Sequence, residues 1–152
     1  LEGYPMRAGW QIPPASVGRR GGAGGTALHA TTQVRAIGAN VPDEAVYYMA
    51  YTDSAGAPLR ADRRYVLRFA RDEIPPVLKE RYGFWSVTMY DRARYLLVDN
   101  VDARYAVRSA DPLVYDRDGS LTIHIQRDPP RDRAQRANWL PAPPTGEFVL
   151  NM

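Results

Sequence analysis

The chain has 152 residues and a mass of 17.1 kDa, with 45% hydrophobic residues, 24% charged residues and a formal net charge of +3. These values are typical of one folded domain and exclude a fully disordered chain. Zero cysteines exclude disulfides and thiolate nucleophiles, and two histidines are too few for a multi-histidine metal site, so we expect neither metal nor cofactor. No apolar run approaches the ~18 residues of a membrane span.

Basic and acidic residues are interleaved along the chain, as in residues 71–73 (RDE) and 131–133 (RDR). A nucleic-acid-binding protein normally has a segregated basic face, so we expect a solvated surface and no nucleic acid. No signal peptide is visible, but the chain begins at Leu1. The sequence therefore leaves export, a membrane anchor missing from this chain and a cytoplasmic location all open.

The first 25 residues are predicted to form a flexible arm, because prolines break helices there and residues 18–25 contain five glycines. Trp10 and Ile12 can anchor this arm to the body or to a partner. Residues 26–38 are expected to form one helix. Residues 26–152 are expected to form a single domain.

Short alternating segments rich in aromatic and β-branched residues predict strands. They cover residues 45–51, 63–69, 84–90, 95–98, 104–108, 121–126 and 147–150. The first two are expected to pair as a hairpin, and the five prolines within residues 127–145 predict an irregular segment. Six or seven short strands predict a mainly β fold, an antiparallel β-sandwich or jelly roll with one N-terminal helix.

Four phrases stand out in the second half of the chain. They are FWSVTMYD at residues 84–91, DNVDARY at 99–105, DGSLTIHIQ at 118–126 and NWLPAP at 138–143. Their order and spacing resemble the family called domain of unknown function 1214, over roughly residues 30–150. The resemblance implies a β-sandwich of jelly-roll type, which in many bacterial proteins follows a partner called domain of unknown function 1254.

The resemblance carries over no catalytic residue, because the activity of the family is unsettled. Family members usually continue past the last strand with an arginine, a tyrosine and a proline. This chain stops at Met152, which indicates a truncated C-terminus.

Aromatic residues on the predicted strands are the main candidates for a ligand site. Five of them are expected to line a cleft that stacks on sugar rings or apolar ligands: Tyr48, Trp85, Tyr90, Tyr105 and Trp139. Arg104, His124 and Asn138 complete the set of eight ligand-binding candidates. The alternative is core packing, with Trp139 buried as a plug, Asn138 bonded to the backbone, and Arg104 in a local ion pair with Asp102.

Catalytic chemistry has weaker support. His124 can act as a general base if its strand face is concave, with a hydroxyl from Ser86 or Thr88; otherwise it faces solvent. Glycoside hydrolysis needs two carboxylates at roughly 5–9.5 Å, and the candidates sit mostly in turns: Asp91, Asp99, Asp102 and Glu147. Asp116 and Asp118 lack the spacing of a calcium loop and are expected to form a turn.

These residues favour a non-catalytic ligand-binding or protein-interaction module. The expected ligand is a carbohydrate or an apolar small molecule, and a protein partner would contact residues 1–25 or the sheet edges. The alternatives are a subunit of a larger assembly and a hydrolase acting on a sugar or ester. Fold alone does not decide among them.

Overall fold

The computed structural model of the chain describes residues 4–14, 17, 40–78, 80, 82–100 and 102–152. The helix expected over residues 26–38 lies outside them, and the division into an arm and a domain stays a prediction. The described part is mainly β. Its elements are β1 (Met6–Arg7), β2 (Trp10–Gln11), β3 (Met49–Ala50), β4 (Tyr65–Phe69), β5 (Ser86–Asp91), β6 (Ala106–Arg108), β7 (Leu121–Gln126), α2 (Arg133–Ala137), β8 (Trp139–Pro141) and β9 (Phe148–Asn151).

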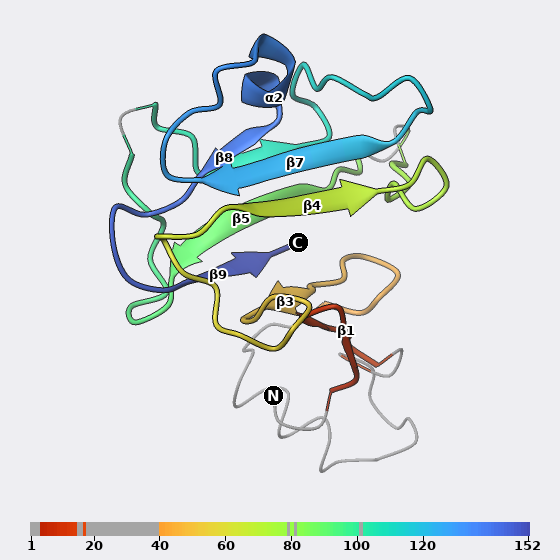
Figure 1. Ribbon diagram of the computed structural model, residues 1–152. Coiled ribbons are helices and arrows are strands. Elements are labelled where there is room, and N and C mark those ends of the chain that lie inside the picture. Colours follow the sequence, from red (N-terminus) through yellow and green to blue (C-terminus); the bar gives the residue numbers. More distant parts are fainter. Residues whose placement is uncertain (1–3, 15–16, 18–39, 79, 81, 101) are drawn as a thin grey trace.

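Two sheets carry the fold (Figure 1). The large sheet has the strand order β1-β2-β3-β9-β5-β6, and the small sheet has the order β4-β7-β8. All neighbouring strands are antiparallel except β7 and β8, which run parallel with His124 opposite Trp139. The expectation of a wholly antiparallel sandwich is therefore wrong for β7 and β8. Parallel neighbours need a crossover connection, and here it contains α2. The jelly-roll topology stays a prediction.

The core lies between the sheets and follows the alternation of the sequence. On β7, Leu121, Ile123 and Ile125 are at most 2% exposed, whereas the residues between them are half-buried. Val87 and Met89 of β5 meet them from the large sheet with at most 1% exposure. The alternation that the sequence predicts over residues 84–90 and 121–126 is confirmed in these two strands.

Two aromatic contacts support the packing of β4 on the large sheet. The rings of Tyr65 and Phe148 meet edge to face with centroids 5.8 Å apart. Those of Phe69 and Trp85 are 6.3 Å apart. Trp85 is only 6% exposed, so core packing describes it better than the cleft wall that we expected.

A tight hairpin brings the N-terminal strands into the large sheet. Ala8 and Gly9 between β1 and β2 both have positive φ, of 49° and 86°, as in the type I′ turns that match strand twist. Trp10 pairs with Ala50 of β3 and packs against the core. A side chain at Gly9 would collide with the backbone oxygen of Thr52, so this close approach requires glycine.

Three strand predictions need correction. Residues 45–51 form only the two-residue β3. This strand pairs with β2 and β9 and not with β4. The expected hairpin is absent because residues 52–58 fold into their own turn and the chain then crosses to the small sheet.

Residues 95–98 make a single bridge through Leu97, since Tyr95 takes a positive φ of 55° that ends the ladder. Residues 127–145 are not wholly irregular, because they contain α2 and β8. Pro141 is accepted in β8 because this strand is an edge.

Candidate functional site

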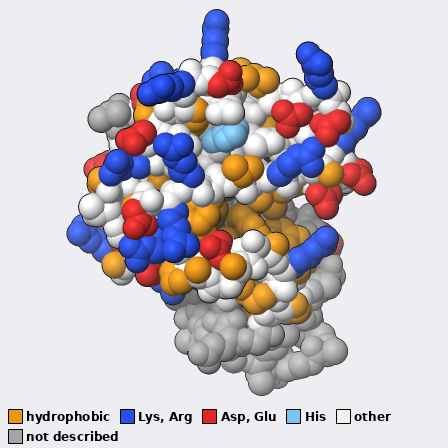
Figure 2. Space-filling view, in the orientation of Figure 1, with side chains coloured by type: hydrophobic (Ala, Val, Ile, Leu, Met, Phe, Trp, Pro, Cys, Tyr) orange, Lys and Arg blue, Asp and Glu red, His pale blue; other side chains and the backbone are white. Residues whose placement is uncertain are grey.

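The two sheets differ in width, and a groove lies at the step between them. β4 is one of the two edge strands of the small sheet, and beside it the large sheet continues with β3, β2 and β1. The groove has a volume of about 520 Å³, within the usual range of ligand sites. Figure 2 shows hydrophobic side chains gathered in this hollow between β4 and β3. Its apolar lining includes Trp10, Ala50, Leu59, Leu67, Ile125 and Leu150.

The edge of β4, rather than one of its faces, borders the groove. Consecutive residues from Arg64 to Arg68 line it, although successive side chains of a strand point to opposite sides. The backbone agrees with this orientation. The N–H of His124 points to β8, where it donates to Asn138 O at 3.0 Å. Successive N–H groups of a strand point to opposite sides, so the N–H groups of Ile123 and Ile125 point to β4. In this register the N–H and C=O groups of Val66 and Arg68 point away from β7, toward the groove.

Arginines border the groove. Arg63 and Arg64 line it and form no ion pair within 4 Å with another described residue. Asp53 also lines it, but its Oδ1 accepts hydrogen bonds from Ala55 N and Ala57 N, both at 3.0 Å. The border of the groove therefore carries excess positive charge above an apolar floor.

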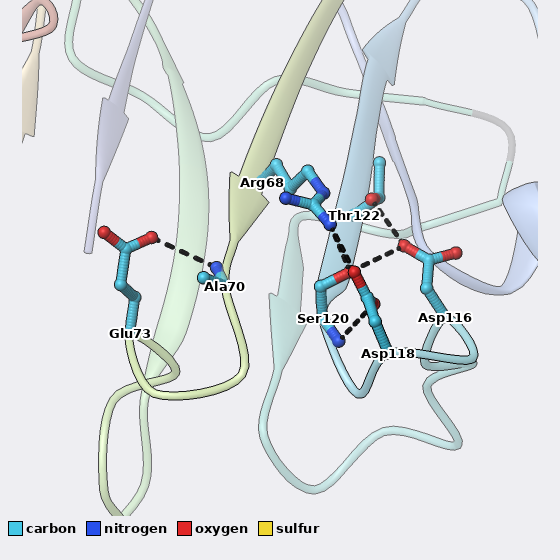
Figure 3. Close-up of polar contacts among 7 residues, drawn as sticks. All are labelled: Arg68, Ala70, Glu73, Asp116, Asp118, Ser120 and Thr122. Carbon is cyan, nitrogen blue, oxygen red and sulfur yellow. Dashed lines mark hydrogen bonds and ion pairs between the residues drawn. The ribbon is translucent and has the colours of Figure 1, made fainter.

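Arg68 is already engaged on the outer face of the small sheet (Figure 3). Its Nη2 donates to Asp118 Oδ2 at 2.8 Å and to Ser120 Oγ at 2.9 Å. The Ser120 hydroxyl lies 2.7 Å from Asp118 Oδ1 and 3.1 Å from Asp116 Oδ2, and Thr122 Oγ1 donates to Asp116 at 3.0 Å. The Ser120 hydroxyl and N–H, with Arg68, lower the pKa of Asp118. This network holds the turn before β7, which confirms the turn that we expected here.

A second hollow, the Arg104 pocket, lies where β6 meets the end of α2. It has a volume of about 480 Å³ and is lined by Asp102, Ala103, Arg104, Tyr105, Ala106, Arg108, Asp111, Pro112, Arg136, Ala137 and Trp139. Arg104 Nη1 donates to Arg136 O at 3.2 Å, and Arg104 Nη2 donates to Ala137 O at 2.6 Å. Burial lowers the pKa of Arg104, and the more distant charges of Asp111 and Asp102 partly offset this effect.

The comparisons with known proteins agree with the β architecture. The sequence model of the family described as Protein of unknown function (DUF1214) matches residues 44–152. The chain belongs to this family. A crystal structure of the VPA0106 protein from Vibrio parahaemolyticus is similar to this chain, with 28% sequence identity and a TM-score of 0.67; the match covers 82% of this chain. The match covers 29% of that longer chain. No curated protein matches this sequence.

Asparagines in the DUF1214 phrases shape the backbone. Asn100 Oδ1 accepts from Arg104 N at 2.9 Å, and Asn100 Nδ2 donates to Val98 O and Arg104 O, both at 3.1 Å. Asn138 is 4% exposed and bonds three backbone groups, Val114 N and O and Thr122 O. These contacts agree with the alternative to ligand binding, in which Asn138 bonds the backbone.

The structure brings together only part of the predicted ligand set. Arg104, Tyr105 and Trp139 line the Arg104 pocket. His124 and Asn138 line a separate hollow of about 430 Å³ on the outer face of the small sheet. Two further candidates lie elsewhere: Tyr48 contributes to an apolar hollow with prolines of the N-terminal segment, and Tyr90 lies half-buried on β5. The single aromatic cleft is therefore not formed.

The catalytic pairing of His124 with a strand hydroxyl has no geometric support. His124 lies on the outer face of the small sheet, opposite the buried Ile123 and Ile125. Ser86 and Thr88 bond each other at 3.4 Å on the outer face of the large sheet. The whole core separates these groups.

Two of the four candidate carboxylates, Asp91 and Glu147, have structural contacts. Asp91 Oδ1 accepts from Ala93 N and Arg94 N at 3.0 and 2.8 Å, and Glu147 pairs with Arg92 at 3.2 Å. Asp102 lines the Arg104 pocket but makes no direct ion pair with Arg104 within 4 Å. Within the described ranges, no three histidine, aspartate or glutamate side chains group as metal ligands. None of the helices in this part of the chain has the length and apolarity to span a bilayer.

Sequence reasoning missed the groove. Trp10 and the pair Arg63 and Arg64 were visible in the sequence, but their meeting depends on which strand forms the edge of the small sheet. The alternation over residues 63–69 gives the inward face of β4 and says nothing about its neighbours. A partial signal is the arginine pair directly before the strand, because natural edge strands often carry charge.

Proposed function

We propose that this DUF1214 domain is a non-catalytic binding module whose groove receives an extended peptide segment as a strand beside β4. The observation that carries the proposal is the lining of the groove by consecutive β4 residues from Arg64 to Arg68. Strand addition to an open sheet edge is a recurrent mode of peptide recognition. It agrees with the expected protein partner at a sheet edge.

The free backbone groups favour a peptide over a sugar or an apolar small molecule. Val66 and Arg68 present two N–H and two C=O groups toward the groove, and an added strand pairs with all four. Its inward side chains would cover Trp10 and Leu150 on the floor. A carbohydrate would match this floor poorly, because the floor offers few polar groups to bond the hydroxyls of a sugar.

Charge gives the sequence preference of the segment. Apolar side chains would alternate with polar ones, because successive residues of the added strand face the floor and the solvent. Arg63 and Arg64 have no ion-pair partner among the described residues, so acidic side chains on the solvent face are favoured. The expected partner is an acidic polypeptide with an alternating apolar segment.

The test uses a short synthetic peptide in which valine alternates with threonine and glutamate, and binding is measured by isothermal calorimetry. Val66→Pro removes one N–H from the free edge and spares the bonds to β7. Val66→Thr is the matched control, because it keeps the N–H and a β-branched side chain. A second control is the same peptide with N-methylated valines, which keeps the side chains but removes backbone donors.

We expect the peptide to bind the original chain and the Val66→Thr variant, and to bind the Val66→Pro variant about fivefold or more weakly. The N-methylated peptide should lose affinity similarly. Equal binding to both variants would overturn strand addition. Saturable binding of cellohexaose or of anilinonaphthalene sulfonate, without peptide binding, would overturn it in favour of a carbohydrate or an apolar small molecule.

A further inference from the structure

We infer that the Arg104 pocket binds a small organic monocarboxylate with an apolar body. Three arginines, Arg104, Arg108 and Arg136, line this single pocket of about 480 Å³. None of them forms an ion pair within 4 Å with a carboxylate of the described residues. Arginine donors in a fork suit a carboxylate, which they can bind with two parallel hydrogen bonds. The site is separate from the groove at β4.

Arg104 is the least solvated of the three arginines. It is half-buried, and its two hydrogen bonds go to the neutral carbonyl oxygens of Arg136 and Ala137. A guanidinium has five N–H donors, so three of them remain available. Burial without a directly bound carboxylate disfavours the charged form, in agreement with its lowered pKa. An incoming carboxylate would relieve this cost.

The pocket is also held in place before any ligand arrives. Asn100 bonds the backbone N and O of Arg104, and β6 begins two residues later in register with β5. On the other side, the two bonds from Arg104 hold the C-terminal end of α2. A pocket with fixed walls loses little ordering entropy on binding.

The remaining lining defines the ligand class. Ala103, Tyr105, Ala106, Pro112 and Ala137 supply apolar contacts for an aromatic or aliphatic body. Two carboxylates, Asp102 and Asp111, also line the pocket and oppose its three arginines, which leaves one excess positive charge. This balance favours a monoanion over the phosphate dianion.

The experiment titrates the isotopically labelled chain with benzoate and follows backbone amide shifts by NMR. Benzamide is the neutral isostere, and inorganic phosphate is the second anion. The double variant Arg108→Gln/Arg136→Gln removes two exposed guanidiniums and spares the Arg104 bonds. Arg131→Gln is the matched control, because it removes an exposed arginine that does not line the pocket.

We expect saturable benzoate shifts at Tyr105, Ala106 and Ala137, and an affinity for benzoate about fivefold higher than for benzamide or phosphate. The double variant should lose about fivefold in benzoate affinity, and Arg131→Gln should bind like the original chain. Equal shifts with benzoate and benzamide, or unchanged binding by the double variant, would overturn the inference. Tighter binding of phosphate would overturn the assignment to a monocarboxylate.

Discussion

The indole Nε1 of Trp139 donates a 2.8 Å hydrogen bond to the backbone oxygen of Gln126. The same oxygen accepts from Ala142 N at 3.0 Å. One carbonyl at the end of β7 therefore holds both a side chain at the start of β8 and the backbone that follows β8. Trp139 is 4% exposed, so this bond is shielded from water. The phrase NWLPAP thus closes one end of the small sheet.

Replacing Trp139 with phenylalanine should destabilise the fold by about 1–3 kcal/mol, because it removes the bond to Gln126 and leaves a small cavity. The free energy of unfolding in urea measures the loss. Trp85→Phe is the control, since Trp85 is similarly buried but its indole makes no hydrogen bond to a described residue. Equal losses in the two variants would show that the Gln126 bond contributes nothing measurable.

Asn138→Ala should cost about 3 kcal/mol or more, because it removes three hydrogen bonds of a buried amide and leaves three partly buried backbone groups without their partner. Asn138→Asp keeps the size but turns a donor into an acceptor that faces the oxygens of Val114 and Thr122, so it should destabilise at least as much at neutral pH. Urea unfolding of both variants measures the effect. A stable Asn138→Asp variant would contradict the assigned orientation of the amide.

Local patterns predicted the strand faces well, and they predicted the strand partners poorly. The alternation over residues 121–126 predicted β7 and its inward side, because each residue of a half-buried strand is selected for one environment. Pairing depends on contacts between distant segments. β3 was therefore assigned to β4 by proximity in sequence, whereas it pairs with β2 and β9. α2 was missed because five residues carry little periodicity, although Asp132 caps it by accepting from Gln135 N at 2.9 Å.

Gly9→Ala should destabilise more than Gly56→Ala. Both glycines have positive φ, of 86° and 84°, which costs a substituted residue about 1 kcal/mol or more. A Cβ at Gly56 would meet open space, whereas one at Gly9 would collide with the Thr52 backbone. Urea unfolding gives the two losses, and the near-ultraviolet circular dichroism of Trp10 reports whether the hairpin leaves the sheet. Equal losses would contradict the close packing of the β1–β2 turn on residues 52–53.

The site was harder to predict than the fold for a physical reason. Trp85 is aromatic because the core needs volume, and it looks the same in the sequence as an aromatic residue that binds a ligand. Tyr105 and Trp139 belong to the same predicted aromatic set and do line a pocket. What separates them from Trp85 is the position in the fold and the neighbours of each side chain. Neither property is a function of spacing along the chain.

Tyr51 predicts how stability changes at alkaline pH. Burial raises the pKa of Tyr51 to about 12, together with a hydrogen bond to Tyr95 and the charge of that residue. The positive charge of Arg92 acts in the opposite direction. The ordinary tyrosine pKa is about 10. Between these two values the folded chain holds a proton that the unfolded chain has lost, so the free energy of unfolding falls as pH rises.

Tyr51→Phe should remove this part of the alkaline slope, because phenylalanine has no proton to lose. Ultraviolet absorbance of the phenolate should also lose one transition near pH 12. Tyr47→Phe is the control, since Tyr47 is 51% exposed. A Tyr51→Phe variant whose stability keeps the same pH dependence as the original chain would show that another group governs unfolding in this range.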